Sequence, residues 1–208
     1  MPITKSQLHK VMHERKSVRK YDASFKIPQE QLEELLIEAT SAPSSSNLQP
    51  WRFLVIQDDA VKKELRAIAN NQEQVETASA IIAVLGDTEM YKNAEAVYTK
   101  NFELGYINET TKDFMINNSI KLYSQLPQEA LTNIVTFDAG LISMQIMLLA
   151  KEMGYDTVPM GGFSKEAFAK HFDLANHIVP VILIAIGKAA APAYNSSRIE
   201  LNNIAKFI

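Results

Sequence analysis

Along most of the chain, hydrophobic and polar residues alternate with the period of amphipathic helices. In a few places, short continuous apolar runs have the length of strands. The pattern predicts a first helix over 4–14, which Thr4 or Ser6 could cap. A second helix is predicted to begin with Pro28 at its first position and to have glutamates in its first turn. Pro43 is predicted to end it. Its leucines fall on one face, so this helix should pack on a core.

Three apolar runs have the length of strands: 51–56, 80–85 and 178–186. A polar helical pattern over 59–70 separates the first two. The third run is rich in Val and Ile and should be buried on both faces, and Pro180 indicates a sheet edge or a bulge near its start. The segment 134–153 is apolar nearly all round and stops before Gly154, so we expect it to be the central helix of the core.

The segment 89–123 is more polar but carries aromatic residues at helical spacings: Tyr91, Tyr98, Phe102 and Tyr106. An aromatic stripe usually belongs to a core. The alternative is a lid or a partner-facing helix, with Tyr98, Phe102 or Tyr106 covering a ligand. The sequence leaves both interpretations open.

Composition and charge place the chain among ordinary globular proteins. Its 208 residues should bury roughly 70% of their surface on folding. A hydrophobic content of 47% and a charged content of 22% exclude disordered, collagen-like and coiled-coil classes. No linker or repeat divides the chain, so we expect a single domain over 1–208. The net charge of −3 provides no basic field for nucleic acid, so any phosphate site must be local.

The absence of cysteine and of long apolar segments excludes further classes of site and location. The chain has no cysteine, which excludes disulfides, thiolate metal sites and a cysteine nucleophile. The first ten residues lack a signal-peptide core, and the uncharged apolar run 139–150 is shorter than the ~18 residues of a membrane span. We therefore expect a cytoplasmic protein with no membrane partner. His9 and His13 lack a third ligand, so we expect no metal.

The segment from Arg15 to Arg19 carries the first candidate chemistry. If it is extended, Arg15, Ser17 and Arg19 share one face, and the two arginines lie about 13 Å apart at ~3.3 Å per residue. That separation is too large for one phosphate but suits the two ends of a nucleotide-sized ligand. The alternative is solvated surface, where most basic pentapeptides lie.

Two further segments could bind a ligand. The sequence Ala-Pro-Ser-Ser-Ser-Asn-Leu-Gln-Pro-Trp over 42–51 supplies hydroxyls and amides, and turn chemistry explains its Pro and Ser but not the whole set. In Val-Pro-Met-Gly-Gly-Phe over 158–163, the glycines let backbone N–H groups approach a planar ligand, or form a tight turn. Neither Gly-x-Gly-x-x-Gly nor a P-loop occurs, so Rossmann and NTPase functions have no support.

The three segments, in this order and at these distances, resemble the FMN-dependent nitroreductase family over about residues 11–198. The resemblance implies an α+β fold, with helices around a mixed, largely antiparallel sheet, in an intertwined homodimer with two FMN sites at its interface. It also implies an oxidoreductase that takes electrons from NADH or NADPH. Such an enzyme reduces a small-molecule acceptor (a nitroaromatic, a quinone or a flavin) by a ping-pong two-electron mechanism, with no side chain needed as acid or base.

The resemblance also assigns the residues around the cofactor. Arg15 and Ser17 would hold the FMN phosphate with Arg198, and Arg19 would lie at the pyrimidine edge and favour the reduced, anionic flavin. The remaining contacts would come from the ring-edge pair Asn71 and Gln74, from Pro159, Met160, Gly161 and Gly162 beside the ring, and, from the other subunit, Pro43, Ser44, Ser45, Ser46 and Asn47.

Other interpretations stay open within this resemblance. The protein could be a flavin carrier or sensor without turnover, or belong to a branch whose flavin activates oxygen. Asp138 stands alone among apolar residues and could cap the buried helix or make a polar contact near the flavin.

Overall fold

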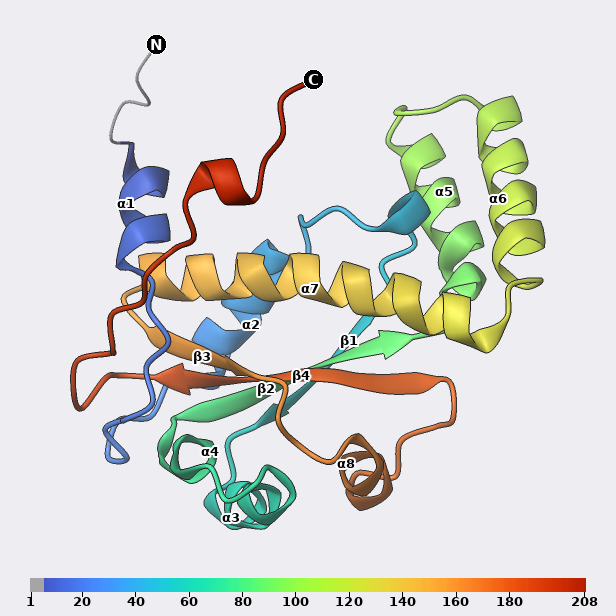
Figure 1. Ribbon diagram of the computed structural model, residues 1–208. Coiled ribbons are helices and arrows are strands. Elements are labelled where there is room, and N and C mark those ends of the chain that lie inside the picture. The colour runs from blue at the N-terminus through green and yellow to red at the C-terminus, as the bar shows by residue number, and fades with distance from the viewer. Residues whose placement is uncertain (1–5) are drawn as a thin grey trace.

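The computed structural model describes residues 6–208, and its centre is an antiparallel sheet with helices on both faces (Figure 1). The strands lie in the order β1-β2-β4-β3, with the bounds β1 (Trp51–Ile56), β2 (Ala80–Asp87), β3 (Asp156–Met160) and β4 (Ile178–Gly187). The α-helices are α1 (Gln7–Glu14), α2 (Gln29–Ala39), α3 (Asp59–Ile68), α4 (Glu73–Thr77), α5 (Ala94–Glu103), α6 (Glu109–Tyr123), α7 (Gln128–Glu152) and α8 (Lys165–His171). Short 3-10 turns are η1 (Ser45–Asn47), η2 (Met90–Asn93) and η3 (Leu201–Asn203).

The predicted α+β class with a largely antiparallel sheet is confirmed. Every pair of neighbouring strands in the described residues is antiparallel. The parallel part of the predicted mixed sheet is an isolated bridge between Ser17 and Thr157. This bridge matters because it joins the arginine segment to the edge strand β3.

Strand alternation divides the core between the two faces of the sheet. On one face, Ile82, Val84 and Ile184 pack against α2 and α7. On the other face, Ile81 and Leu183 pack in the cluster that contains side chains of α3, α4 and α8. All five side chains are fully buried. The two-sided burial predicted for the third apolar run is therefore confirmed over 183–187, whereas Ile178, Val179, Val181 and Ile182 are half-buried.

The strand β4 contains the irregularity that Pro180 predicted. Val84 pairs with Ile182, but the next residue, Leu85, pairs with Pro180, so Val181 bulges out of the ladder. The edge is confirmed as well: within the described residues β3 pairs only with 183–187 of β4, so at Pro180 the strand has β2 on one side and a sheet edge on the other. Proline has no N–H to donate to a ladder, and the bulge accommodates it.

The helix α7 is the central helix, as predicted, but it begins at Gln128 rather than at 134, after Pro127 at the N-cap. Its end is confirmed by Gly154, whose φ of +80° closes the helix. A Cβ added to Gly86 of β2 would lie 2.6 Å from Val135 Cγ2, so this glycine sets how closely α7 approaches the sheet. By length and composition α7 could cross a membrane, yet it packs on all four strands of this sheet.

The helices α5 and α6 form a hairpin beside α7 (Figure 1). Tyr98 is only 1% exposed, whereas Phe102 is 39% and Tyr106 is 72% exposed. The aromatic stripe is therefore divided. Tyr98 belongs to the core, and the other two side chains face outward.

The first helix has one of its two predicted caps and ends at the predicted Glu14, whereas the second helix differs from the prediction at both ends. Ser6 caps α1, and Thr4 lies outside the described residues. Pro28 is the N-cap of α2 and not its first residue, because its ψ of 141° is extended. The helix ends at Ala39, before Pro43, where the hydroxyls of the next two residues bond its last carbonyl groups.

Candidate cofactor site

The arginine segment leaves α1 in an extended conformation and runs beside β3. Arg15 is the C-cap of α1, with ψ at 120°. The N–H of Val18 donates to the carbonyl of Thr157 at 3.1 Å, and the Val18 side chain is buried. Alternation then turns Ser17 and Arg19 away from that core. The extended conformation predicted for this segment is confirmed.

Two buried polar atoms beside this segment have no hydrogen-bond partner among residues 6–208. They are Nε of Arg15 and Oγ1 of Thr157. A buried donor without a partner costs free energy of about 1–3 kcal/mol, so native structures rarely keep one without a ligand or water to satisfy it. Both atoms therefore need a partner that residues 6–208 do not supply. Thr157 was not predicted as a site residue. The single signal in the sequence was its position immediately before the motif that begins at Val158.

The helix α4 lies against the same segment. Lys20 forms an ion pair with Glu73 at the start of α4. Gln74 is buried, and its amide donates to the Gln72 side chain at 3.0 Å. Asn71 is exposed in the turn before α4, with φ at +57°. The helix that carries Gln74 therefore meets the chain at Lys20, the residue after the arginine segment.

The glycine pair is tied to the turn between α3 and α4. The carbonyl of Gly162 accepts hydrogen bonds from the side chains of Asn70 at 2.9 Å and Gln72 at 3.0 Å. The sequence analysis did not predict Asn70 or Gln72 as site residues. Asn70 and Asn71 are consecutive asparagines, which are a turn signal, and both are left-handed here. The turn also ends α3 before residue 70, where the helix was predicted to end. Gly161 and Gly162 are exposed. Nothing lies within 4 Å of a Cβ added to Gly161, so its backbone borders open space.

Pro159 and Met160 complete this side of the site. They end β3, where they pair with Ile184 and Leu183 of β4. Met160 is buried, and Pro159 is half-buried. The chain thus brings one set of predicted residues together around β3: Arg15, Ser17, Arg19, Asn71, Gln74, Pro159, Met160, Gly161 and Gly162.

The loop of residues 44–49, named here the serine loop, lies elsewhere in the same chain. Its backbone is left-handed at Ser46 (φ +48°), Asn47 (+53°) and Gln49 (+49°). Such conformations cost serine or glutamine about 1 kcal/mol or more, so surrounding contacts must hold them. Ser45 binds Asp138, and Ser46 binds two tyrosines.

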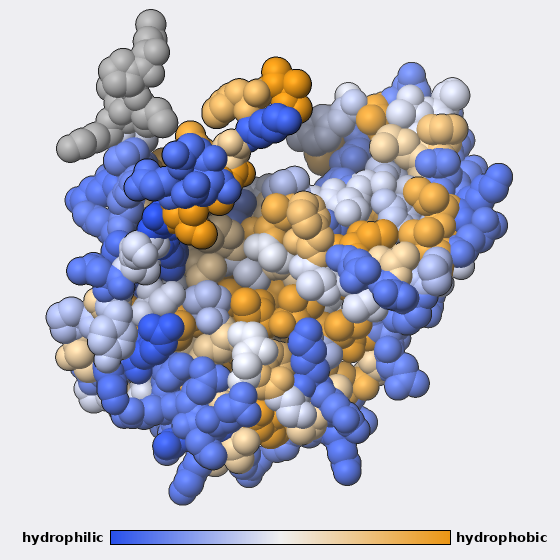
Figure 2. All heavy atoms as spheres, in the orientation of Figure 1, coloured by the Kyte–Doolittle hydropathy of each residue, from blue (hydrophilic) through white to orange (hydrophobic). Residues whose placement is uncertain are grey.

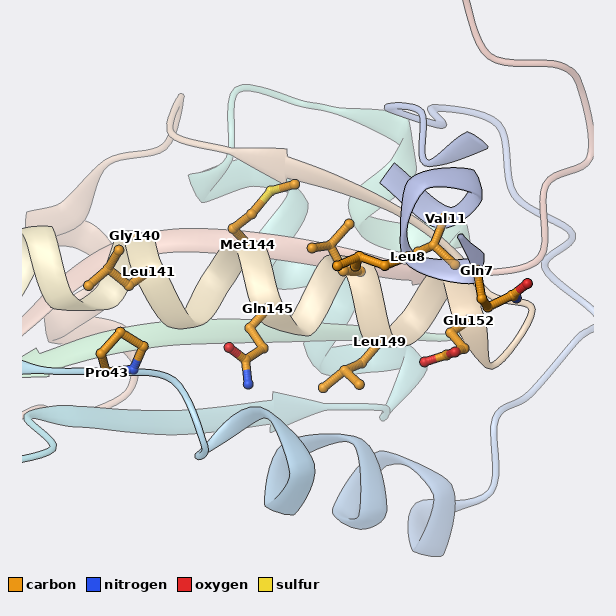
Figure 3. A pocket seen from close by; sticks show the side chains of 11 residues that line it. Gln7, Leu8, Val11, Pro43, Gly140, Leu141, Met144, Gln145, Leu149 and Glu152 are labelled. Carbon is orange, nitrogen blue, oxygen red and sulfur yellow. The ribbon is translucent and has the colours of Figure 1, made fainter. Parts of the chain in front are cut away.

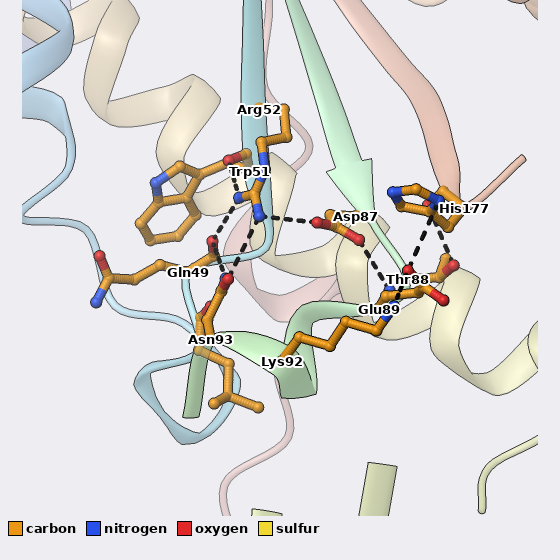
Figure 4. Close-up of polar contacts among 10 residues, drawn as sticks. Gln49, Trp51, Arg52, Asp87, Thr88, Glu89, Lys92, Asn93 and His177 are labelled. Atoms are coloured by element: carbon orange, nitrogen blue, oxygen red, sulfur yellow. Dashed lines mark hydrogen bonds and ion pairs between the residues drawn. The ribbon is translucent and has the colours of Figure 1, made fainter. Parts of the chain in front are cut away.

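The far end of the serine loop is anchored by a polar cluster at the ends of β1 and β2 (Figure 4). Arg52 donates to the carbonyl of Gln49 at 3.3 Å and forms an ion pair with Asp87 at 2.8 Å. The Asn93 amide donates to the carbonyl of Leu48 at 2.8 Å. These contacts fix where the loop enters the sheet. None of the three side chains was predicted: Asn93 lies 45 positions from Leu48, and Asp87 lies 35 positions from Arg52.

Asp138 is not the cap of the buried helix. It lies well inside α7, which begins at Gln128, and its side chain is fully buried. Its carboxylate accepts the Ser45 N–H at 3.0 Å and the Ser45 hydroxyl at 3.1 Å. The interpretation as a helix cap is therefore wrong, and a contact near the flavin stays a prediction.

Arg198 lies in the C-terminal segment after β4. Its guanidinium donates to the Ser196 hydroxyl at 2.8 Å and the Ser197 carbonyl at 2.7 Å. The last hydrogen bond that ties this segment to the sheet region, within the described chain, runs from Ala190 to the carbonyl of Lys20. The hydrogen bonds of the Arg198 guanidinium in the described chain therefore stay within residues 196–198.

A groove of about 570 Å³ runs along α7 and α1 (Figure 3). Pro43 lies at one end beside Gly140, and Leu8 and Val11 lie toward the other end near Glu152. Of the predicted site residues, only Pro43 lines this groove. In the same described region, no three His, Asp or Glu side chains gather as a metal site.

Arg15 Nε and Thr157 Oγ1 thus lack partners among residues 6–208, and the backbone at Gly161 borders open space. The family model described as "Nitroreductase family" matches residues 12–188. The protein YdgI of Bacillus subtilis, named as a candidate NAD(P)H nitroreductase, is 44% identical over 199 residues, which cover 95% of each chain. The chain therefore belongs to the nitroreductase family and is an oxidoreductase.

Two further relatives show what related chains bind or do. The crystal structure of a candidate nitroreductase from Exiguobacterium sibiricum in complex with FMN superposes with a TM-score of 0.93, at 40% identity and 98% coverage of both chains. The CLA biosynthesis enone reductase of Lactiplantibacillus plantarum is 32% identical over 209 residues, covering 99% of this chain and 96% of its own.

Proposed function

We propose that this protein is an FMN-dependent NAD(P)H oxidoreductase that reduces nitroaromatics, quinones or flavins by a ping-pong mechanism. The observation that carries the proposal is the unpaired Arg15 Nε, buried beside β3 in a nitroreductase fold. When bound, FMN accepts a hydride from the nicotinamide and passes two electrons to the acceptor. The chain supplies binding, orientation and charge.

The residues around β3 fit FMN. Arg15 and Ser17 hold its phosphate, because a guanidinium donates to phosphate oxygens through charge-assisted hydrogen bonds. Arg19, four residues along an extended segment, lies at the pyrimidine edge of the flavin. Asn71 and Gln74 bond the polar rim of the ring. The N–H groups of Gly161 and Gly162 face its N5 side, with Pro159 and Met160 against the ring.

The second half of the site comes from a partner subunit in a homodimer. Pro43 and the serine loop serve the partner's FMN, and Arg198 reaches the phosphate through the C-terminal segment. In Figure 3, Pro43 lies beside Gly140, whereas α1, which leads to Arg15, lies toward Glu152. Those two positions on α7 are about 18 Å apart at 1.5 Å per residue. This separation supports a site that two chains complete together.

The exposed apolar surface supports the same dimer. In the C-terminal segment, Ile199, Ile204 and Phe207 are 67–87% exposed. Figure 2 shows further apolar side chains over α7 and the α5–α6 hairpin. An isolated chain rarely leaves so much apolar surface in water, so a second copy covers it. The chain acts as one FMN-binding domain over 1–208, in the cytoplasm.

Anaerobic addition of NADH or NADPH to the yellow protein tests the activity. We expect the flavin absorbance to bleach and to return when a quinone or a nitroaromatic is added. Initial rates should give parallel double-reciprocal lines, because donor and acceptor use one flavin face in turn. Failure to bleach would instead identify a carrier or sensor, and product formed only in oxygen would identify the oxygen-dependent branch. The acceptor panel should include an enone, the class named for one relative.

Paired variants test the shared site. Arg15→Ala and Asn47→Ala homodimers should each bind FMN poorly at both sites. In mixed dimers isolated with two tags, both lesions fall in one site and the other is intact, so half of the sites should regain tight FMN. Mixed dimers that bind no more FMN than the homodimeric variants would contradict the shared site.

A further inference from the structure

The serine loop is connected to its own chain through a buried carboxylate. Asp138 is fully buried, and residues 6–208 show no ion pair to it. The Ser45 N–H lies 3.2 Å from Oδ1 and 3.0 Å from Oδ2, and the Ser45 hydroxyl donates to Oδ1 at 3.1 Å. The loop therefore supplies the donors that this carboxylate has. An isolated buried carboxylate is otherwise unfavourable, so the contact constrains both partners.

The residue after this contact is held from the opposite direction. Tyr98 of α5 donates its hydroxyl to the carbonyl of Ser46 at 2.6 Å. The Ser46 hydroxyl lies 2.8 Å from the hydroxyl of Tyr123 at the end of α6. Asp138 and the two tyrosines thus fix consecutive residues where the backbone turns left-handed. The strained conformation is kept by α7 and the α5–α6 hairpin and not by the loop sequence alone.

These anchors leave the outward side of the loop free. Asn47 is exposed, and within residues 6–208 its side-chain oxygen accepts a hydrogen bond only from the Gln49 amide of the same loop, at 3.4 Å. Leu48, in contrast, is fully buried and packs in the cluster of Tyr98 and Tyr123. The loop is therefore held from inside and presents Asn47 outward.

We propose that Asp138 is a positioning residue that holds the serine loop in the conformation that binds FMN in the partner subunit's half of the site, with Tyr98 as its second support. The inference rests on the proposed shared site. Under this proposal, Asp138 of one protomer affects the affinity for the FMN that is bound mainly by the other protomer. Asp138 does not touch that cofactor.

The test measures FMN dissociation constants and FMN content in full-length dimers. Asp138→Asn keeps the size of the side chain but places an amide N–H₂ against donors of Ser45, so the homodimer should bind FMN roughly tenfold more weakly. Ser143→Ala is the matched control, because it removes a buried hydroxyl of α7 that bonds only within that helix, at 2.6 Å to Ala139. It should leave FMN affinity unchanged.

Mixed dimers separate a positioning effect from a folding defect. Asp138→Asn paired with Arg15→Ala places both lesions in one site, so half of the sites should regain tight FMN. Asp138→Asn paired with Asn47→Ala damages the serine loop of both protomers, so no site should recover. A general defect of the Asp138→Asn chain would abolish recovery in the first pairing as well, and that result would overturn the proposal.

A second variant and one control decide the remaining outcomes. If Asp138→Asn does not fold, Tyr98→Phe removes the bond to Ser46 without changing the ring and should show the same pairing pattern with a smaller loss. Normal FMN binding by the Asp138→Asn homodimer overturns the proposal. If Arg15→Ala with Asn47→Ala recovers but the Asp138 pairing does not, the inference alone fails. If that control itself fails, the shared site fails and the inference with it.

Discussion

The two halves of the proposed site differ in how their polar groups are satisfied. The arginine segment is held by a backbone contact to β3, and its Arg15 Nε is buried with no hydrogen-bond partner in the part of the chain that the structure describes. The serine loop has a strained backbone, yet Asp138 and Tyr98 bond it internally. The first half is completed by its ligand, whereas the second is formed in advance. FMN affinity should therefore depend on charges in the first half and on support in the second.

The largest effect is expected from the unpaired half. Arg15→Ala removes a charge-assisted contact to phosphate worth about 1.5–3 kcal/mol, so FMN affinity should fall roughly tenfold to a hundredfold. Fluorescence titration of the apoprotein with FMN measures this loss. Lys16→Ala, which removes the same charge one residue along the chain, is the control and should change affinity little. Equal losses of affinity in both variants would show a general effect of net charge and would contradict the assignment of Arg15 to the phosphate.

A smaller effect is expected at the other end of the same segment. Arg19 is exposed, so its charge is screened, and Arg19→Ala should lower the two-electron potential of bound FMN by roughly 20 mV, which corresponds to about 1 kcal/mol. Anaerobic titration against a redox dye measures the potential. Arg19→Lys keeps the charge and should restore most of it. An unchanged potential in Arg19→Ala would contradict the placement of Arg19 beside the flavin.

The sequence predicted the local structure of the arginine segment better than that of the serine loop, for a physical reason. Alternation along 15–19 and the glycine pair are local patterns, so the extended segment and its partner residues could be placed from neighbouring positions. The strand runs were likewise local, and 51–56 matches β1 at both ends. Helix ends were less accurate, because capping at Pro28 and Pro127 is decided by backbone angles that composition does not reveal.

The support of the serine loop could not be predicted from sequence. Asp138 lies 93 positions from Ser45, and Tyr98 lies 52 from Ser46. No periodicity links residues at such separations, and an acidic residue in an apolar helix fits a cap as well as a buried anchor. The left-handed conformation of Ser46 is equally hidden, since serine has no preference for it. Long-range contacts thus determine the half of the site that local patterns left open.

The smallest effect concerns the pH dependence of stability at Asp138. Burial raises the pKa of this carboxyl group above 3.8, and the Ser45 hydrogen bonds oppose that rise. The native state therefore binds the proton more tightly than the unfolded state. The contribution of this group to the free energy of unfolding consequently increases as the pH falls from neutral through the raised native pKa.

Carboxylates such as Asp59 and Glu73 act in the opposite sense, because their ion pairs lower their pKa values and their contribution is lost in acid. The comparison must therefore be made as a difference between the FMN-saturated wild type and Asp138→Asn, in which the other groups cancel. Urea unfolding at several pH values between 7 and 4 measures it. We expect the stability advantage of the wild type to grow as the pH falls. A difference that shrinks toward acid would show that the Ser45 donors outweigh burial, and that the serine loop stabilises a charge in the core more strongly than the core opposes it.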